Sequence, residues 1–186
     1  MIQEVSFARE ILTAWNLILP VATAGVIHMF AVKKDWLKDL KIPVARKLFG
    51  ENKTWRGFVL MPLLSALTTL GCAGFFPFSL MEPVEILGIG WISGLAYVLA
   101  ELPNSALKRK LGIAPGKLPE GSSWRQKLPF LILDQADSAI GCAIAYGWMI
   151  PELSALSLVL CASLAPVIHL SVNLLLFAGG LRKNPF

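Results

Sequence analysis

Hydrophobic side chains gather into five long runs that are separated by charged segments. The runs cover approximately residues 11–32, 58–80, 84–102, 128–150 and 153–181. Each run is close to the ~20 residues that an α-helix needs to cross ~30 Å of hydrocarbon. The pattern predicts an all-α integral membrane protein with about five transmembrane helices, folded as a single polytopic domain over residues 1–186.

Basic residues are concentrated in the segments between these runs. Every Lys and Arg except Arg9 lies in one of two predicted loops, residues 33–57 and 103–127, or in the C-terminal tail. The short turns near 81–83 and 151–152 carry Glu82 and Glu152 but no basic residue. Because cytoplasmic loops are enriched in Lys and Arg, we predict an external N-terminus, with both basic loops and the C-terminus in the cytoplasm.

The composition agrees with a membrane protein. The 186 residues are 55% hydrophobic and only 16% charged, whereas soluble domains are about 25% charged. The net charge of +5 is explained by topology, so we expect no nucleic-acid partner. Three cysteines lie in apolar runs without CxxC spacing, which favours free structural thiols over a disulfide framework or zinc site.

Three carboxylates interrupt the apolar pattern near the predicted cytoplasmic face. Glu101 ends the third run, and Asp134 and Asp137 lie three residues apart on one face of the fourth. No basic residue within a run can neutralise them. Since Mg²⁺ prefers hard oxygen ligands, we predict that the carboxylates bind one or two Mg²⁺ ions, with Mn²⁺ as an alternative. Polar helix packing is another interpretation, and a small cation or proton transporter that uses the same acids is the alternative function.

The first basic loop carries groups suited to phosphate binding. Lys53, Thr54 and Arg56 offer cationic and hydroxyl donors, and Gly57 permits close backbone approach. They directly precede the second run, where a helix N-terminus would favour an anion. Contact with anionic lipid headgroups is the alternative interpretation.

The second basic loop has a similar character. Ser105, Lys108 and Arg109 would share one face of a short helix, and a Pro-Gly turn with Gly116 and Lys117 follows. A phosphate bound there would meet two positive charges and a hydroxyl. In the last run, His169 precedes a mildly polar patch that packs against neighbours or lines a cavity.

The order of these motifs resembles that of a known family. Ser105-Ala-Leu-Lys-Arg109, a Pro-Gly loop and Asp134-Gln-Ala-Asp137 resemble the signature of integral-membrane CTP:phosphatidate cytidylyltransferases. Glu101 stands where that signature has a carboxylate, and Gln135 replaces its Arg. Residues 48–57 and 111–117, with the five runs, are most similar to the CDP-archaeol synthases, the short branch that acts on ether lipids.

The resemblance implies a nucleotidyltransferase of phospholipid biosynthesis in the cell membrane. Such an enzyme transfers CMP from CTP to a membrane lipid phosphate at the cytoplasmic face and releases pyrophosphate, giving a CDP-archaeol-like or CDP-diacylglycerol-like lipid. The residues implied fall into three groups: metal-binding Glu101, Asp134 and Asp137; catalytic Asp134, Asp137, Lys108 and Arg109; and substrate-binding Lys53, Thr54, Arg56, Gly57, Ser105, Gly116 and Lys117.

Two further functions agree less well with the sequence. The motif of the CDP-alcohol phosphotransferases is absent, and a non-catalytic scaffold would leave the aligned acids unexplained.

The third run contains small residues that permit close helix packing, either within the chain or in a homodimer: Gly88, Gly90 and Gly94.

Overall fold

The fold is built from helices, as the sequence predicts. The computed structural model describes residues 2–119, 121 and 123–181. Within these residues, the only β-structure is one isolated bridge between Pro43 and Thr54. The helices are α1 (Ile2–Lys33), α2 (Arg46–Phe49), α3 (Trp55–Gly71), α4 (Pro83–Lys110), α5 (Trp124–Met149) and α6 (Ala155–Ala178). Arg182 and Lys183, which contributed to the predicted orientation, lie outside the described residues.

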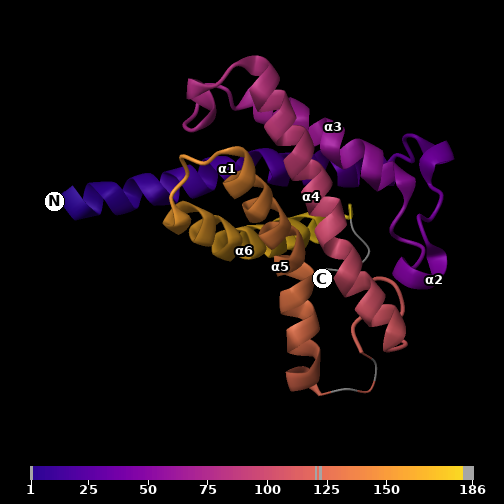
Figure 1. Cartoon of the computed structure of the whole chain (residues 1–186). Coiled ribbons are helices and arrows are strands. Elements are labelled where there is room, and N and C mark those ends of the chain that lie inside the picture. The colour runs from indigo at the N-terminus through magenta and orange to yellow at the C-terminus, as the bar shows by residue number, and fades with distance from the viewer. Residues whose placement is uncertain (1, 120, 122, 182–186) are drawn as a thin grey trace.

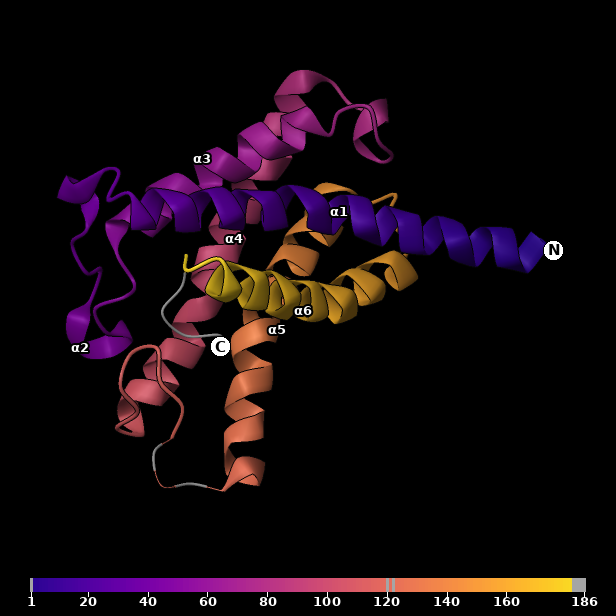
Figure 2. The same cartoon turned by 180° about the vertical axis from the view of Figure 1, so that it is seen from behind.

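The five long helices pack as a closed ring. α1 contacts α3, α3 contacts α4, α4 contacts α5, α5 contacts α6, and α6 returns to α1. The C-terminal end of α4 and the N-terminal end of α5 extend together beyond α1 and α6, and α2 lies near the end of α1 that is remote from the N-terminus (Figures 1 and 2). The basic loops therefore gather at one end of the ring.

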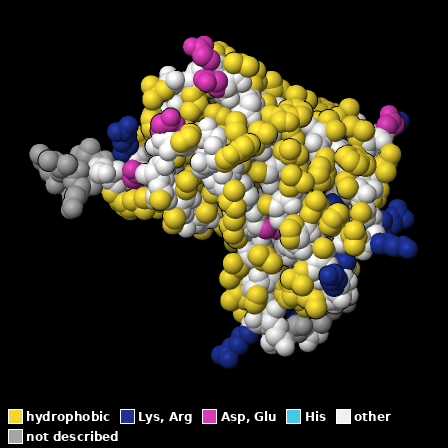
Figure 3. Space-filling view, viewed as in Figure 1, with side chains coloured by type: hydrophobic (Ala, Val, Ile, Leu, Met, Phe, Trp, Pro, Cys, Tyr) yellow, Lys and Arg dark blue, Asp and Glu magenta, His cyan; other side chains and the backbone are white. Residues whose placement is uncertain are grey.

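Hydrophobic side chains cover much of the face that Figure 3 shows. Four described helices are long and apolar enough to cross a membrane: α1 from Ser6, α4, α5 and α6. α3 has 17 residues, or ~26 Å, so it is shorter than the predicted run 58–80. It ends at Gly71 because the apolar residues that follow form a turn and a 3-10 helix, Phe78–Leu80.

α4 is longer than the run 84–102. The whole helix has 28 residues, or ~42 Å, and it continues through Pro103. It ends just before Gly112, which adopts a positive φ of 72°. The predicted boundary at residue 102 therefore lies inside α4, and the short helix predicted for Ser105, Lys108 and Arg109 is present as the C-terminal part of α4. The loop spans only residues 111–123, and Ser105, Lys108 and Arg109 lie on α4 itself.

Two glycines allow α3 and α4 to pack closely. A Cβ atom on Gly90 would lie 2.6 Å from the carbonyl oxygen of Ser65, and one on Gly94 would lie 2.6 Å from that of Met61. A Cβ on Gly88 would meet nothing within 4 Å. Gly90 and Gly94 thus serve packing within the chain, whereas Gly88 does not.

Hydrogen bonds between helices tie the opposite end of the ring together. The hydroxyl group of the buried Tyr146 on α5 donates to the carbonyl oxygen of Leu17 on α1 at 2.9 Å. Nearer the N-terminus, the Glu10 carboxylate on α1 accepts from the hydroxyls of Ser154 and Ser157 at the start of α6. Cys72, Cys142 and Cys161 are buried and free, as predicted.

Candidate functional site

One cavity of about 940 Å³ reaches from the basic loops into the ring of helices. The wall near the loops is polar, whereas the wall between α1, α3 and α6 is apolar and includes Val26, Met61 and Ile168. All twelve residues that the sequence analysis selected line this cavity: Lys53, Thr54, Arg56, Gly57, Glu101, Ser105, Lys108, Arg109, Gly116, Lys117, Asp134 and Asp137. The structure brings them together, and their roles remain predictions.

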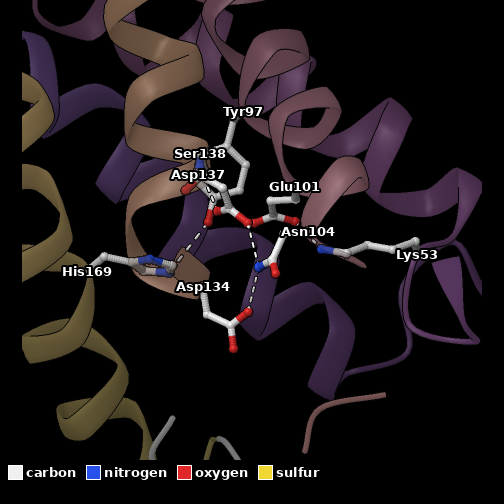
Figure 4. Close-up of polar contacts among 8 residues, drawn as sticks. All are labelled: Lys53, Tyr97, Glu101, Asn104, Asp134, Asp137, Ser138 and His169. Carbon is white, nitrogen blue, oxygen red and sulfur yellow. Dashed lines mark hydrogen bonds and ion pairs between the residues drawn. The ribbon is translucent and has the colours of Figure 1, made fainter. Parts of the chain in front are cut away.

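Two helix faces form the polar wall. On α4, Glu101, Ser105 and Lys108 repeat at helical spacing, so that their side chains point the same way. Glu101 lies near the aspartates of α5 in Figure 4, and Ser105 and Lys108 line the same cavity as these aspartates. The extension of α4 beyond residue 102 makes this possible, because a loop there would not keep Lys108 aligned with Glu101.

Asn104 lies between the two aspartates and was missed by the sequence analysis. Its Nδ2 donates to Oδ1 of Asp134 at 2.7 Å and to Oδ2 of Asp137 at 3.1 Å (Figure 4). The side chain is only 6% exposed, and its Oδ1 is buried without a hydrogen-bond partner in the described part of the chain. Its spacing from Glu101, i and i+3, is the sequence signal that would have identified it.

Two ion pairs cross the cavity. Lys53 of the first loop pairs with Glu101, and Lys108 pairs with Asp134. The backbone positions Lys53, because its carbonyl accepts from the amide of Val44 at 2.9 Å. Burial alone would lower the pKa of Lys53, but the carboxylates of Glu101, Asp137 and Asp134 together outweigh this effect and leave the pKa raised. Lys53 is therefore protonated at neutral pH.

Arg56 is buried at the start of α3, with 4% of its surface exposed. Its Nη1 donates to Oδ1 of Asp35 at 3.1 Å and to the carbonyl of Trp36 at 3.3 Å. Asp35 has a positive φ of 54° in the turn that follows α1. Arg56 thus joins this turn to α3 as well as lining the cavity.

Arg109 is suited to binding an anion. Its Nε and Nη1 are buried and, among the described residues, have no hydrogen-bond partner. Gly50 of the first loop packs beside it and against Pro115 of the second, where a Cβ on Gly50 would come within 2.8 Å of the proline ring. A buried guanidinium without a partner is costly, and a phosphate oxygen would satisfy it.

The donor chemistry fits Mg²⁺, but the carboxylates do not form a ready-made cluster. The described residues include no group of three His, Cys, Asp or Glu arranged to hold a metal ion. Two carboxylates pair with lysines, and the partnerless Asn104 Oδ1 is a further hard oxygen near the aspartates. Mg²⁺ commonly binds through one or two carboxylates plus water and substrate phosphates, so the fit depends on Asp134 and Asp137.

The cavity wall also includes a polar patch from α6. His169 Nε2 lies 3.5 Å from the hydroxyl of Tyr97 on α4 (Figure 4). Asn173 donates to Oε1 of the buried Gln135 at 3.4 Å. His169 and Asn173 line the cavity, which confirms one interpretation of this patch. The sequence analysis noted Gln135 only as a replacement within the aspartate motif and did not identify Tyr97, because their polar contacts depend on a helix distant in the chain.

Comparison with known proteins identifies the family. The CarS-like family model, described as CDP-archaeol synthase, matches residues 7–186. The chain belongs to the CDP-archaeol synthase family. This is a family of cytidylyltransferases, and the apolar helices of the chain agree with a multi-pass membrane enzyme.

Curated relatives named CDP-archaeol synthase support this assignment. The protein from Thermofilum pendens is 28% identical over 192 residues, which covers 100% of this chain and 84% of that protein. The protein from Natronomonas pharaonis is 30% identical over 150 residues, 75% of this chain and 72% of its own length. The protein from Staphylothermus marinus is 34% identical over 101 residues, 54% of this chain and 48% of that protein. No solved structure matches the chain.

Proposed function

We propose that this protein transfers CMP from CTP to a lipid phosphate, giving a CDP-lipid and pyrophosphate. The lipid we propose is a glycerol phosphate that carries ether-linked isoprenyl chains, as the name of the relatives suggests. The observation that carries the proposal is one continuous cavity, in which the polar wall with its lysine and arginine side chains adjoins the apolar wall. A nucleotide triphosphate needs the first, and a lipid phosphate needs both.

Different residues of the polar wall are suited to different phosphate groups of the two substrates. Lys53 and Thr54 lie at the start of α3 and would bind CTP phosphates. Lys108 and Arg109 lie on α4 and would bind phosphate of CTP or of the lipid, with Ser105 as a hydroxyl donor. Because all of these groups lie at the basic end of the ring, we propose that the site faces the cytoplasm, in accordance with the positive-inside rule.

The reaction is a substitution at phosphorus. An oxygen of the lipid phosphate forms a bond to the α-phosphorus of CTP, and the bond from that phosphorus to the α–β bridging oxygen breaks. Pyrophosphate leaves with the electron pair. The nucleophile is already an anion, so no strong general base is required. The main barrier is repulsion between two polyanions, which lysine and arginine side chains reduce.

Asp134 and Asp137 would hold Mg²⁺, with Glu101 nearby. When bound, Mg²⁺ would supply positive charge that offsets the negative charge of the substrate phosphates. The chain's own residues orient the reactants: Asn104 fixes the aspartates, and the apolar wall keeps the lipid phosphate at the boundary between hydrocarbon and water. Beyond the carboxylates, the wall includes Leu17, Met61 and Tyr146, all fully buried, which favours a dead-end substrate cavity over a transport path.

The direct test uses purified protein with labelled CTP, Mg²⁺ and a panel of lipid phosphates. The panel contains phosphatidic acid, its ether analogues and isoprenyl ether phosphates. We expect CDP-lipid and pyrophosphate in equal amounts, and no product when EDTA removes Mg²⁺. Failure to form CDP-lipid with every member of the panel would refute the proposal.

The aspartates provide a sharper test. Asp134→Asn and Asp137→Asn should each abolish CDP-lipid formation while the protein is still expressed in the membrane. Glu152→Gln is the matched control, because it removes a carboxylate that lies outside this cavity. Near-wild-type activity in either aspartate variant would exclude the metal assignment, and a loss in the control would show a general effect.

A further inference from the structure

The side chain of Asn104 has an environment that packing alone does not explain. It is as deeply buried as Asn16 on α1, since each is 6% exposed. Asn16 makes one hydrogen bond, from Nδ2 to the carbonyl oxygen of Phe76 at 3.0 Å. Asn104 instead divides its Nδ2 between two carboxylates and leaves its Oδ1 without a partner among the described residues.

The orientation of the Asn104 amide follows from its neighbours. A carboxylate oxygen of an ionised aspartate can only accept hydrogen bonds. With an oxygen of Asp134 at 2.7 Å and one of Asp137 at 3.1 Å, the group between them must be the NH₂ donor. The two carboxylates therefore fix the amide, and the amide in turn fixes one oxygen of each carboxylate.

We propose that Asn104 is a positioning residue that holds Asp134 and Asp137 in one mutual arrangement for cytidylyl transfer. Two aspartate side chains three residues apart on one helix face can each rotate away from the other. A neutral donor shared by both opposes this movement without cancelling their charge. Lys108 cannot do the same, because it neutralises Asp134 and contacts only that carboxylate in its ion pair.

The remaining contacts of the aspartates leave this task to Asn104. Asp137 Oδ1 accepts from the amide of Ser138 at 2.6 Å, a contact within α5 that does not relate it to Asp134. The bond from Asn104 is the shared one, and it crosses from α4 to α5 (Figure 4). Asn104 thereby also links the two helix faces that form the polar wall.

The inference rests on the proposed function, and two measurements separate them. The first is steady-state kinetics of Asn104→Ala with CTP and the best lipid phosphate. Loss of a group that orients metal-binding side chains typically costs about 10–100-fold in metal affinity or activity. With Mg²⁺ at saturating concentration, we expect kcat to fall by that factor while KM for CTP changes little, since Asn104 contributes no charge to triphosphate binding.

The second measurement is Mn²⁺ binding to the purified protein, followed by electron paramagnetic resonance without lipid or turnover. We expect Asn104→Ala to weaken Mn²⁺ binding by about 10–100-fold relative to the wild type. Asn16→Ala is the matched control and should retain the wild-type Mn²⁺ affinity and kcat. Asn104→Asp adds an isosteric variant that leaves no cavity and lacks the donor, and its kcat should also fall at least tenfold.

The outcomes are distinguishable. Wild-type kcat in Asn104→Ala or Asn104→Asp, or wild-type Mn²⁺ affinity in Asn104→Ala, overturns the positioning role and leaves the proposed function intact. An equal rise of KM for CTP in place of the fall in kcat also overturns it, because Asn104 would then bind nucleotide. A wild-type protein that makes no CDP-lipid overturns the proposed function and with it this inference.

Discussion

Replacing Gly94 with alanine tests whether the close contact between α3 and α4 supports the fold. The new Cβ would lie 2.6 Å from the carbonyl oxygen of Met61 and 2.7 Å from Cα of Pro62. Both are backbone atoms, so the contact is relieved only by moving one helix. Overpacking of this kind typically costs about 1–3 kcal/mol.

Gly88→Ala is a control on the same helix. Alanine is favoured over glycine in a helix by roughly 1 kcal/mol, and both variants gain this term. A Cβ at Gly88 meets nothing within 4 Å, so the difference between the variants isolates the clash. With about 2–4 °C of melting temperature per kcal/mol, Gly94→Ala should melt roughly 2–12 °C below Gly88→Ala.

Thermal unfolding in detergent, followed by tryptophan fluorescence, measures this difference. The chain contains six tryptophans, and one of them, Trp91, lies on α4 between the two glycines. Because Glu101 follows Gly94 on the same helix, Gly94→Ala should also lower CDP-lipid formation below its melting temperature. If the melting temperature of Gly94→Ala equals or exceeds that of Gly88→Ala, the close contact at Gly94 does not contribute to the packing of α3 against α4.

Two further predictions concern charged side chains. Glu10→Ala removes the acceptor for Ser154 and Ser157; it should destabilise the protein by roughly 1 kcal/mol without changing kcat in the folded state, and an unaltered melting temperature would contradict a role in joining α1 to α6. The Lys53–Glu101 pair concerns pH: since the folded-state pKa of Lys53 is raised, its stabilisation is complete below the ordinary lysine pKa of ~10.4 and is lost as pH rises through the folded value. The difference in melting temperature between wild type and Lys53→Met should thus be constant up to about pH 10 and shrink above it; a difference that already shrinks near neutral pH would argue against the pair.

The sequence predicts the helical membrane architecture because hydrophobic run length is dictated by the bilayer. It is less reliable where a helix ends. The third hydrophobic run ended at residue 102, but α4 continues through Pro103 to Lys110. Residues 72–80 are apolar and suggested a helix, but the chain turns there before the 3-10 helix Phe78–Leu80. Hydropathy does not distinguish an apolar turn from an apolar helix.

The candidate site could be predicted well for charged residues and poorly for neutral ones. Glu101 and the two aspartates are conspicuous in apolar runs because a charge there is costly. Asn104 and Gln135 are less costly to bury, so their partners become apparent only when α4, α5 and α6 are placed together. The ion pairs from Lys53 and Lys108 were also not foreseen, since the carboxylates were assigned to a metal alone.

These two ion pairs give two of the three carboxylates of the site a positively charged partner from the chain itself. Lys53 forms an ion pair with Glu101, and Lys108 forms one with Asp134. A metal ion alone would have to displace a lysine from a carboxylate, and a nucleotide alone would have to draw a lysine away from one. If the metal and the nucleotide bind together, the lysines would move to the nucleotide phosphates and leave the carboxylates to the metal. Binding of the metal should therefore raise the affinity for the nucleotide, and binding of the nucleotide should raise the affinity for the metal by the same factor. The two ion pairs would thereby make the binding of nucleotide and metal cooperative.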